Sequence, residues 1–154
     1  MIRVQQEDFN IGEEIRNLTE GHYEVGAVVT FTGLVRDMAK GEAISEMELE
    51  HYPGMTEKEL ERIEQIARDR WPLTGTLIIH RYGKLKPGDN IVLVITTSAH
   101  RQASFDSAAF LMDYLKTNAT FWKRETSANG GEWVDARETD LDMLDRWNIP
   151  ASSK

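Results

Sequence analysis

Apolar and polar positions follow one another along this chain in patterns that predict a short helix and then several strands. Residues 10–19 carry apolar side chains at helical spacing, and Asn10 is suited to cap the first turn. Four segments are rich in β-branched or alternating apolar residues and predict strands: 26–35, 45–51, 76–82 and 91–97. The first is predicted to be buried. In the second, Met47 and Leu49 alternate with glutamates, which predicts one water-facing side.

Two longer helices are predicted between and after these strands. Thr56 and Glu59 fit a capping box behind a Pro-Gly turn, and Pro72 is expected to end that helix. Ser98 is suited to cap the second helix, which should run to about Thr117. Its apolar face is expected to consist of residues at three- and four-residue spacing: Phe105, Ala108, Met112 and Leu115.

The C-terminal part is expected to add two strands, 120–126 and 132–134, joined by a turn at 129–131, and a short helix around 143–147. Several strands around two main helices indicate the α+β class. A length of 154 residues suits one domain, or one domain with a small appended lobe.

Composition narrows the chemistry that this chain can carry out. It contains no cysteine, which excludes disulfides, thiolate metal sites and a cysteine nucleophile, so any sulfur that it transfers must come from a partner or co-substrate. The net charge of −8 argues against a general nucleic-acid surface. No apolar run is long enough to span a bilayer, and the first residues do not resemble a signal peptide, so we expect a cytoplasmic protein that does not bind membranes.

Basic residues gather in one part of this acidic chain. Between residues 98 and 124 there are four basic side chains against two acidic ones, and His100 lies there as well. A local excess of positive charge suits a small anion, although chance clustering on a solvated face would look the same. The sharpest feature is the Ser98-Ala99-His100-Arg101 segment, because the first turn of a helix presents unpaired N–H groups and a partial positive charge. It predicts a phosphate cradle. The alternative is a helix whose first turn is merely polar.

Two lysines and two arginines are further candidates. Lys116 is expected to end the helix that Arg101 begins, and Lys123 to lie in the following strand; neighbouring cations could make either one a nucleophile or a general acid/base. Alone, Lys116 is more often an ordinary charge in the last helical turn. Arg36, at the end of a strand, and Arg137 could clamp an anion or could simply be solvated.

Other groups point less clearly to a site. Glu46, Glu48 and Glu50 share one strand face but are spaced too widely for one small ion, so a water-facing surface is the better interpretation. The four histidines lack zinc-site spacing, and no metal or cofactor is predicted. The aromatic residues could be core or could wall a pocket for a planar heterocycle.

Six motifs occur in an order that resembles the large, catalytic subunit family of molybdopterin synthase: FTGLVR (31–36), LEHYPGMTE (49–57), TSAHR (97–101), MDYLKT (112–117), FWKRE (121–125) and WVDARE (133–138). The resemblance extends from about residue 26 to residue 147. It implies an α/β hammerhead with a small added antiparallel β subdomain, for which the segment 36–52 is a candidate within a single 1–154 domain.

The resemblance also implies partners and a reaction. The family forms a homodimer at the centre of a heterotetramer, and each large subunit binds a small ubiquitin-like sulfur carrier whose C-terminal Gly-Gly ends in a thiocarboxylate. The substrate is cyclic pyranopterin monophosphate, a phosphorylated pterin, and the product is molybdopterin with its dithiolene. No resident cofactor is implied.

Carried over to this sequence, the resemblance assigns Lys116 and Lys123 to the family's essential lysines. Its substrate-pocket positions fall on several other residues: Arg36, His100, Arg101, Arg137, Phe31, Met112 and Glu125. We therefore expect the two lysines to lie beside an anion cradle made by Arg36, His100 and Arg101. Lys116 would transfer protons or briefly accept the carrier's acyl group, and Lys123 would stabilise the developing oxyanion. Two other functions stay open from the residues alone: a non-catalytic anion- or nucleotide-binding scaffold, and a phosphoester hydrolase using His100.

Overall fold

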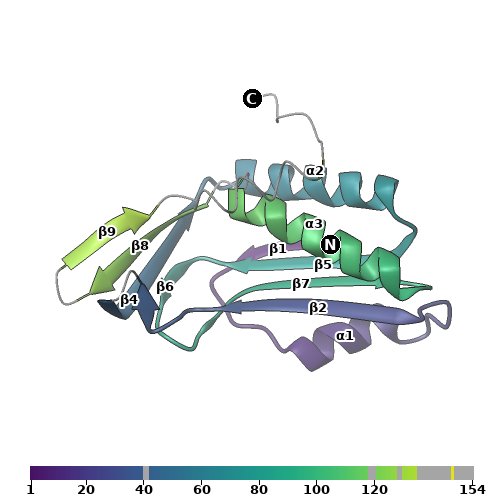
Figure 1. The fold of residues 1–154 in the computed structure, drawn as a ribbon, viewed down its shortest axis with the longest axis horizontal. Coiled ribbons are helices and arrows are strands. Elements are labelled where there is room, and N and C mark those ends of the chain that lie inside the picture. Colours follow the sequence, from purple (N-terminus) through teal and green to yellow (C-terminus); the bar gives the residue numbers. More distant parts are fainter. Residues whose placement is uncertain (40–41, 118–120, 128–129, 135–146, 148–154) are drawn as a thin grey trace.

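The computed structural model describes residues 1–39, 42–117, 121–127 and 130–134 together with Trp147. These residues form three helices and nine strands arranged in two sheets (Figure 1). The α+β class expected from the sequence is therefore confirmed. The short helix expected around 143–147 lies outside the described residues, apart from Trp147.

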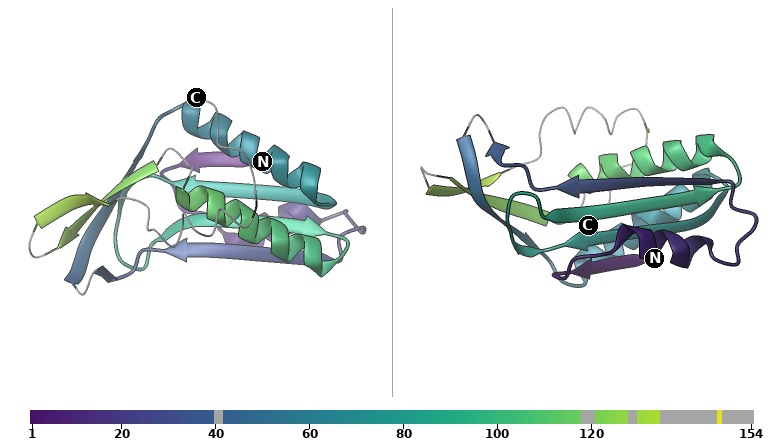
Figure 2. Two further views of the ribbon diagram at one scale, coloured as in Figure 1. Left: turned by 45° about the horizontal axis from the view of Figure 1, so that its top comes forward. Right: turned by 90° about the horizontal axis from the view of Figure 1, so that it is seen from below.

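The larger sheet has the strand order β1-β5-β7-β2. Its strands are β1 (Ile2–Gln5), β5 (Leu73–Arg81), β7 (Asn90–Ser98) and β2 (Ala27–Leu34). β1 runs parallel to β5, and the other pairs are antiparallel. Helices α2 (Met55–Arg70) and α3 (Arg101–Thr117) cover one face, and α1 (Ile11–Thr19) lies on the other, as Figure 2 shows from below. Because β2 is last in the strand order, it is an edge strand.

The two central strands are buried on both faces because helices cover both sides of them. Ile78, Val92 and Val94 pack under α2 and α3. Their neighbours along the same strands point the other way, toward α1: Leu77, Ile79, Leu93 and Ile95. This doubly covered position explains why both segments are continuously apolar rather than alternating.

The smaller sheet extends from one end of the larger one (Figure 1). It contains β3 (Met38–Ala39), β4 (Glu42–His51), β6 (Gly83–Leu85), β8 (Phe121–Ser127) and β9 (Gly130–Val134). The expected alternation in β4 is present, because Met47 and Leu49 are buried in a small core with Val35 and Leu85. The segment 36–52 supplies only β3 and β4. Three later stretches of chain complete this lobe.

Three local expectations need correction. Asn10 caps α1 as predicted, its side chain accepting from Glu13 N at 3.0 Å. The N-cap of α2, however, is Gly54 rather than Thr56: the Glu57 carboxylate accepts from Gly54 N at 2.5 Å, and Gly54 has φ +86°. Thr56 instead lies buried in the first turn.

α3 is rotated relative to the expected apolar face. Phe105 is 57% exposed, whereas Phe110, Leu111 and Tyr114 are buried against the sheet. Ser98 belongs to β7 and donates to Pro72 O at 2.7 Å, so it does not cap the helix. The periodicity predicted the helix correctly, but the sheet selected a different stripe of it.

β2 is the third correction, because it is not buried. Val28, Phe31 and Leu34 are 38%, 40% and 50% exposed. The strand pairs only with β7, so its second edge carries no ladder among the described residues. Apolar side chains on an open edge are typical of a surface that meets another chain.

Candidate functional site

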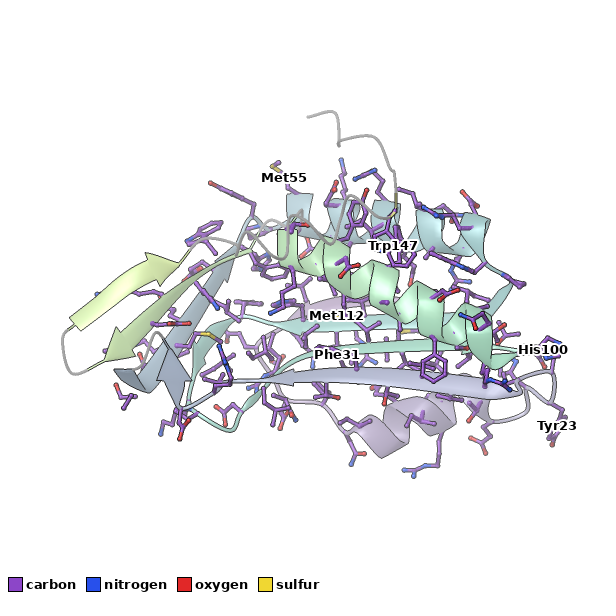
Figure 3. The ribbon with its side chains drawn as sticks, viewed as in Figure 1. Tyr23, Phe31, Met55, His100, Met112 and Trp147 are labelled. Atoms are coloured by element: carbon purple, nitrogen blue, oxygen red, sulfur yellow. The ribbon has the colours of Figure 1, made fainter. Side chains whose placement is uncertain are left out.

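Helix α3 separates the predicted site residues into two groups. His100 and Arg101 lie at its N-terminus and are exposed, while Lys116 lies in its last turn. A helical rise of about 1.5 Å per residue puts these two ends about 22 Å apart. Figure 3 shows His100 at the far right of the molecule, at the opposite end from the smaller sheet.

Strand β2 places Arg36 with Lys116 and not with His100. Ala27 pairs with Ser98, and Gly26 N donates to Ser98 O at 2.9 Å, so this strand begins beside the His100 turn. It ends at Leu34, at the opposite end of β7, and Arg36 follows there. The single cradle expected from Arg36, His100 and Arg101 is therefore wrong for one chain.

The two lysines, in contrast, lie at the same end of the molecule. Phe121 begins β8, and Lys123 and Glu125 follow on the same strand face because side chains alternate. The Phe121 ring stacks on the His80 ring, with centroids 3.7 Å apart and planes 17° apart. Lys116 is near enough to the same imidazole for its charge to affect the pKa of His80. His80 thus connects the helix that carries one lysine to the strand that carries the other.

The environment of His80 is unusual for a titratable group. Burial is the largest cause that lowers the pKa of this imidazole from 6.5 to about 4, and the charges of Lys116 and His51 act in the same direction. A hydrogen bond between Nδ1 and Arg81 O, 2.8 Å long, opposes the shift. The ring is therefore uncharged at neutral pH, and it does not repel the lysine.

Lys123 has an acidic neighbour on its own strand. Its Nζ lies 3.4 Å from Glu125 Oε1, and the side chains are 36% and 15% exposed. This pair gives Glu125 a physical role, since a largely buried carboxylate restricts where the Lys123 ammonium can lie. An ion pair this exposed is worth little for stability, so its effect is on orientation.

Phe31 and Met112 lie between the two ends, on neighbouring elements. Phe31 pairs with Val94, which faces α2 and α3, so Phe31 is on the α3 side of the sheet. Met112 packs partly buried against the same core. Figure 3 shows both labelled residues in the middle of the molecule, along α3 and β2. Arg137 lies outside the described residues, and its predicted role stays a prediction.

Sequence reasoning missed His80 and His51, which it considered only as metal ligands. Within the described ranges, no group of three or more His, Asp or Glu side chains could hold a metal ion. A usable signal was present: a lone histidine ends the otherwise apolar run 77–80, where burial would keep it uncharged. Its stacking partner, Phe121, is too distant in sequence for any pattern to reveal.

No helix among the described residues is long and apolar enough to cross a membrane. The cytoplasmic location expected from the sequence stays a prediction.

Comparisons with known proteins agree on one family. Residues 4–118 match the family model described as MoaE protein. The chain is 55% identical to the molybdopterin synthase catalytic subunit of Mesorhizobium japonicum over 148 residues, which are 95% of this chain and 92% of that protein.

Solved structures are similar as well. The molybdopterin biosynthesis MoaE protein of Burkholderia ambifaria superposes with a TM-score of 0.83 at 47% identity, covering 97% of this chain and 99% of that one. The molybdopterin synthase of Staphylococcus aureus has a TM-score of 0.77 at 33% identity, covering 86% and 95% of the two chains.

Proposed function

Because the chain belongs to the MoaE protein family, we propose that it is the catalytic subunit of molybdopterin synthase. It converts cyclic pyranopterin monophosphate to molybdopterin, with sulfur supplied by the thiocarboxylated C-terminus of a small carrier protein. The observation that carries this function is that Lys116 and Lys123 lie at the same end of the molecule, on a helix and a strand that meet at the His80–Phe121 stack. The family names favour this function over a non-catalytic scaffold.

An external sulfur donor follows from the absence of cysteine. The carrier's sulfur forms a bond to a substrate carbon as a bond from that carbon to oxygen breaks, and the oxygen leaves as water or with the opened cyclic phosphate. The bond from this sulfur to the carrier's carbonyl carbon must then break. Water can accept the acyl group directly, or the Lys116 amine can accept it first and release it on hydrolysis. Lys123 stabilises the negative charge that forms on the oxygen of the acyl group, and Glu125 orients the Lys123 ammonium. Each carrier delivers one sulfur, so two are used for each dithiolene.

The substrate's phosphate is the natural ligand of the α3 N-terminus. His100 and Arg101 add positive charge where the helix already presents N–H groups. Neither side chain has a hydrogen bond or ion pair within the part of the chain that the structure describes. About 22 Å of helix, however, separates this turn from Lys116.

A second copy of the chain would remove this separation. If the open edge of β2 paired with β2 of another copy, the two strands would run antiparallel around a two-fold axis. The start of α3 in one copy would then lie near Arg36 and Lys116 of the other. The exposed Val28, Phe31 and Leu34 on this edge support such pairing. We therefore propose a homodimer in which each pocket combines the lysines of one copy with the phosphate cradle of its partner.

Replacing Lys116 tests the catalytic assignment. With Lys116→Ala and thiocarboxylated carrier, we expect the rate of dithiolene formation to fall about 10²–10⁴-fold, as for loss of one general acid–base group. Lys58→Ala, which removes an exposed lysine of α2, is the matched control and should be fully active. Activity of Lys116→Ala close to that of the control would remove this lysine from the mechanism.

A further inference from the structure

A cluster of rings fills the junction between the two sheets and the end of α3. We name the side chains of His51, His80, Tyr82 and Phe121 the imidazole cluster. The His51 ring lies 4.6 Å from Tyr82 and 5.8 Å from Phe121, centroid to centroid, and the His80 ring stacks on Phe121 at 3.7 Å. The four residues come from β4, β5, the turn after β5 and β8. Simple packing could be done by aliphatic side chains, so the two histidines require another explanation.

We propose that His80 is a positioning residue for the two catalytic lysines: its buried imidazole holds Phe121, and through it the Lys123 strand, at a fixed place beside the end of α3. This inference rests on the proposed function, because it explains how that site keeps its shape. His80 itself touches no reacting atom in this role.

The orientation of the His80 ring is set by its own strand. A carbonyl oxygen can only accept, so Nδ1 carries the proton and donates to Arg81 O at 2.8 Å. This bond fixes the tautomer and leaves one ring face to Phe121. With the planes only 17° apart, the ring of His80 defines the plane of Phe121.

His51 holds the same aromatic ring from a second direction. The Thr56 hydroxyl donates its single proton to Tyr52 O at 3.0 Å, so it accepts from His51 Nδ1 at 3.2 Å. His51 is thereby tied to the first turn of α2. Phe121 contacts two imidazoles that each have a hydrogen-bond partner, so its place is better defined than hydrophobic contacts alone would make it.

Phe121 transmits this order to Lys123. The two residues are one pleat apart on the same face of β8, about 6.6 Å along the strand. Lys123 pairs with Leu49, and Phe121 pairs with His51, so both belong to one continuous ladder with β4. The charge of Lys116, at the end of α3, acts on His80 as well. The cluster therefore sets the relative position of two amines that come from separate elements.

No simpler side chain provides both the ring stack and the hydrogen bond of His80. Phenylalanine could stack but could not donate to Arg81 O, and asparagine could donate from nearly the same point but could not stack. Because the imidazole is uncharged at neutral pH, it also adds no repulsion between the ammonium groups. Together these properties distinguish a positioning role from filling of the core.

Kinetics of the assembled synthase test the proposal. We compare His80→Ala, His80→Phe and His80→Asn with Ile79→Ala, a buried neighbour on β5 that faces α1 instead. A displacement of about 1 Å in a catalytic group costs about 10²-fold, so we expect kcat of His80→Ala to fall by about that factor while KM for substrate and carrier changes less than twofold. The Phe and Asn variants should each recover part of kcat. Ile79→Ala should be equally destabilised to urea and retain its kcat.

A second measurement does not depend on the synthase reaction. Brief acylation with acetic anhydride, read by peptide mass spectrometry, reports the reactivity of Lys116 and Lys123 relative to exposed Lys58. We expect His80→Ala to change the ratio for both lysines at least about threefold, because their surroundings are no longer fixed. Wild-type kcat in His80→Ala, a kcat loss matched by Ile79→Ala, or unchanged acylation ratios would each overturn the proposal. Absence of dithiolene formation by the wild type would instead reject the proposed function.

Discussion

The two ends of α3 carry similar positive charge but are built in different ways. At the C-terminal end, the elements that carry Lys116 and Lys123 meet where the buried His80 stacks on Phe121, and Glu125 lies 3.4 Å from Lys123. At the N-terminal end, His100 and Arg101 stand exposed on the first turn. One end is pre-organised by its own chain, whereas the other offers an anion site that needs something from outside to complete it.

This difference shows how one chain can prepare a reaction without holding a complete pocket. Catalytic amines have to be positioned before the substrate arrives, which requires buried, hydrogen-bonded support. A phosphate cradle is less demanding, because helix N–H groups and flexible cations adapt to the anion. The open edge of β2 runs between the two ends, and a second copy on that edge would bring the unlike ends together.

Between about pH 6.5 and 4, the stability of the protein should depend on the buried His80 at the lysine end of α3. The pKa of His80 is about 4 in the folded chain and 6.5 in the unfolded chain, so the unfolded chain binds more protons between these two pH values. Stability is therefore lost as the pH falls from about 6.5 toward 4, by at most roughly 3 kcal/mol, or about 10²-fold in the unfolding equilibrium.

Urea unfolding at several pH values measures this loss. His80→Phe should flatten the profile over that interval, because it removes the group that titrates. His100→Asn, which changes the exposed histidine at the other end of α3, should leave the profile as in the wild type. Equal slopes in wild type and His80→Phe would contradict the assignment of this stability to the buried imidazole.

A charge on the β2 edge should separate the two ends again. Lysine on an open edge strand opposes pairing with another strand, so Val28→Lys is expected to shift sedimentation velocity toward the monomer and to lower activity about tenfold or more at fixed concentration. Gln65→Lys adds the same charge on the exposed side of α2 and serves as the control. A Val28→Lys protein that is monomeric and fully active would show that one chain forms the whole pocket.

Mixing two inactive proteins gives a smaller but more specific effect. If each pocket takes Lys116 from one copy and Arg101 from the other, Lys116→Ala and Arg101→Ala subunits exchanged together should regain about a quarter of wild-type activity, because half of the dimers are mixed and each has one intact pocket. Exchange is followed by native mass spectrometry. No recovery in samples with mixed dimers would confine both residues to a single-chain site.

Local pattern identified most elements of this fold. Alternation in β4 correctly put Met47 and Leu49 inside, and the Asn10 cap of α1 is where the sequence expected it. The candidate lysines also came from the sequence, through motif and charge. The alternation of a strand and the spacing of a helix involve residues only two to four positions apart, so they are visible without a structure.

Strand neighbours and ring contacts were decided only by the tertiary structure. The apolar run 26–35 looked like a buried strand, but its place at the end of the order β1-β5-β7-β2 leaves it an exposed edge. The expected cradle of Arg36 with His100 failed because β2 and α3 carry these residues to opposite ends of the sheet.

The sequence by itself determined the kinds of group available: amines and imidazoles, no thiol, and an anion-binding helix terminus. The tertiary structure decided which of these groups meet, by stacking Phe121 on His80 and leaving His100 remote from Lys116. The physical reason is that side-chain chemistry belongs to each residue, whereas proximity depends on the order in which distant segments pair within a sheet and pack across it.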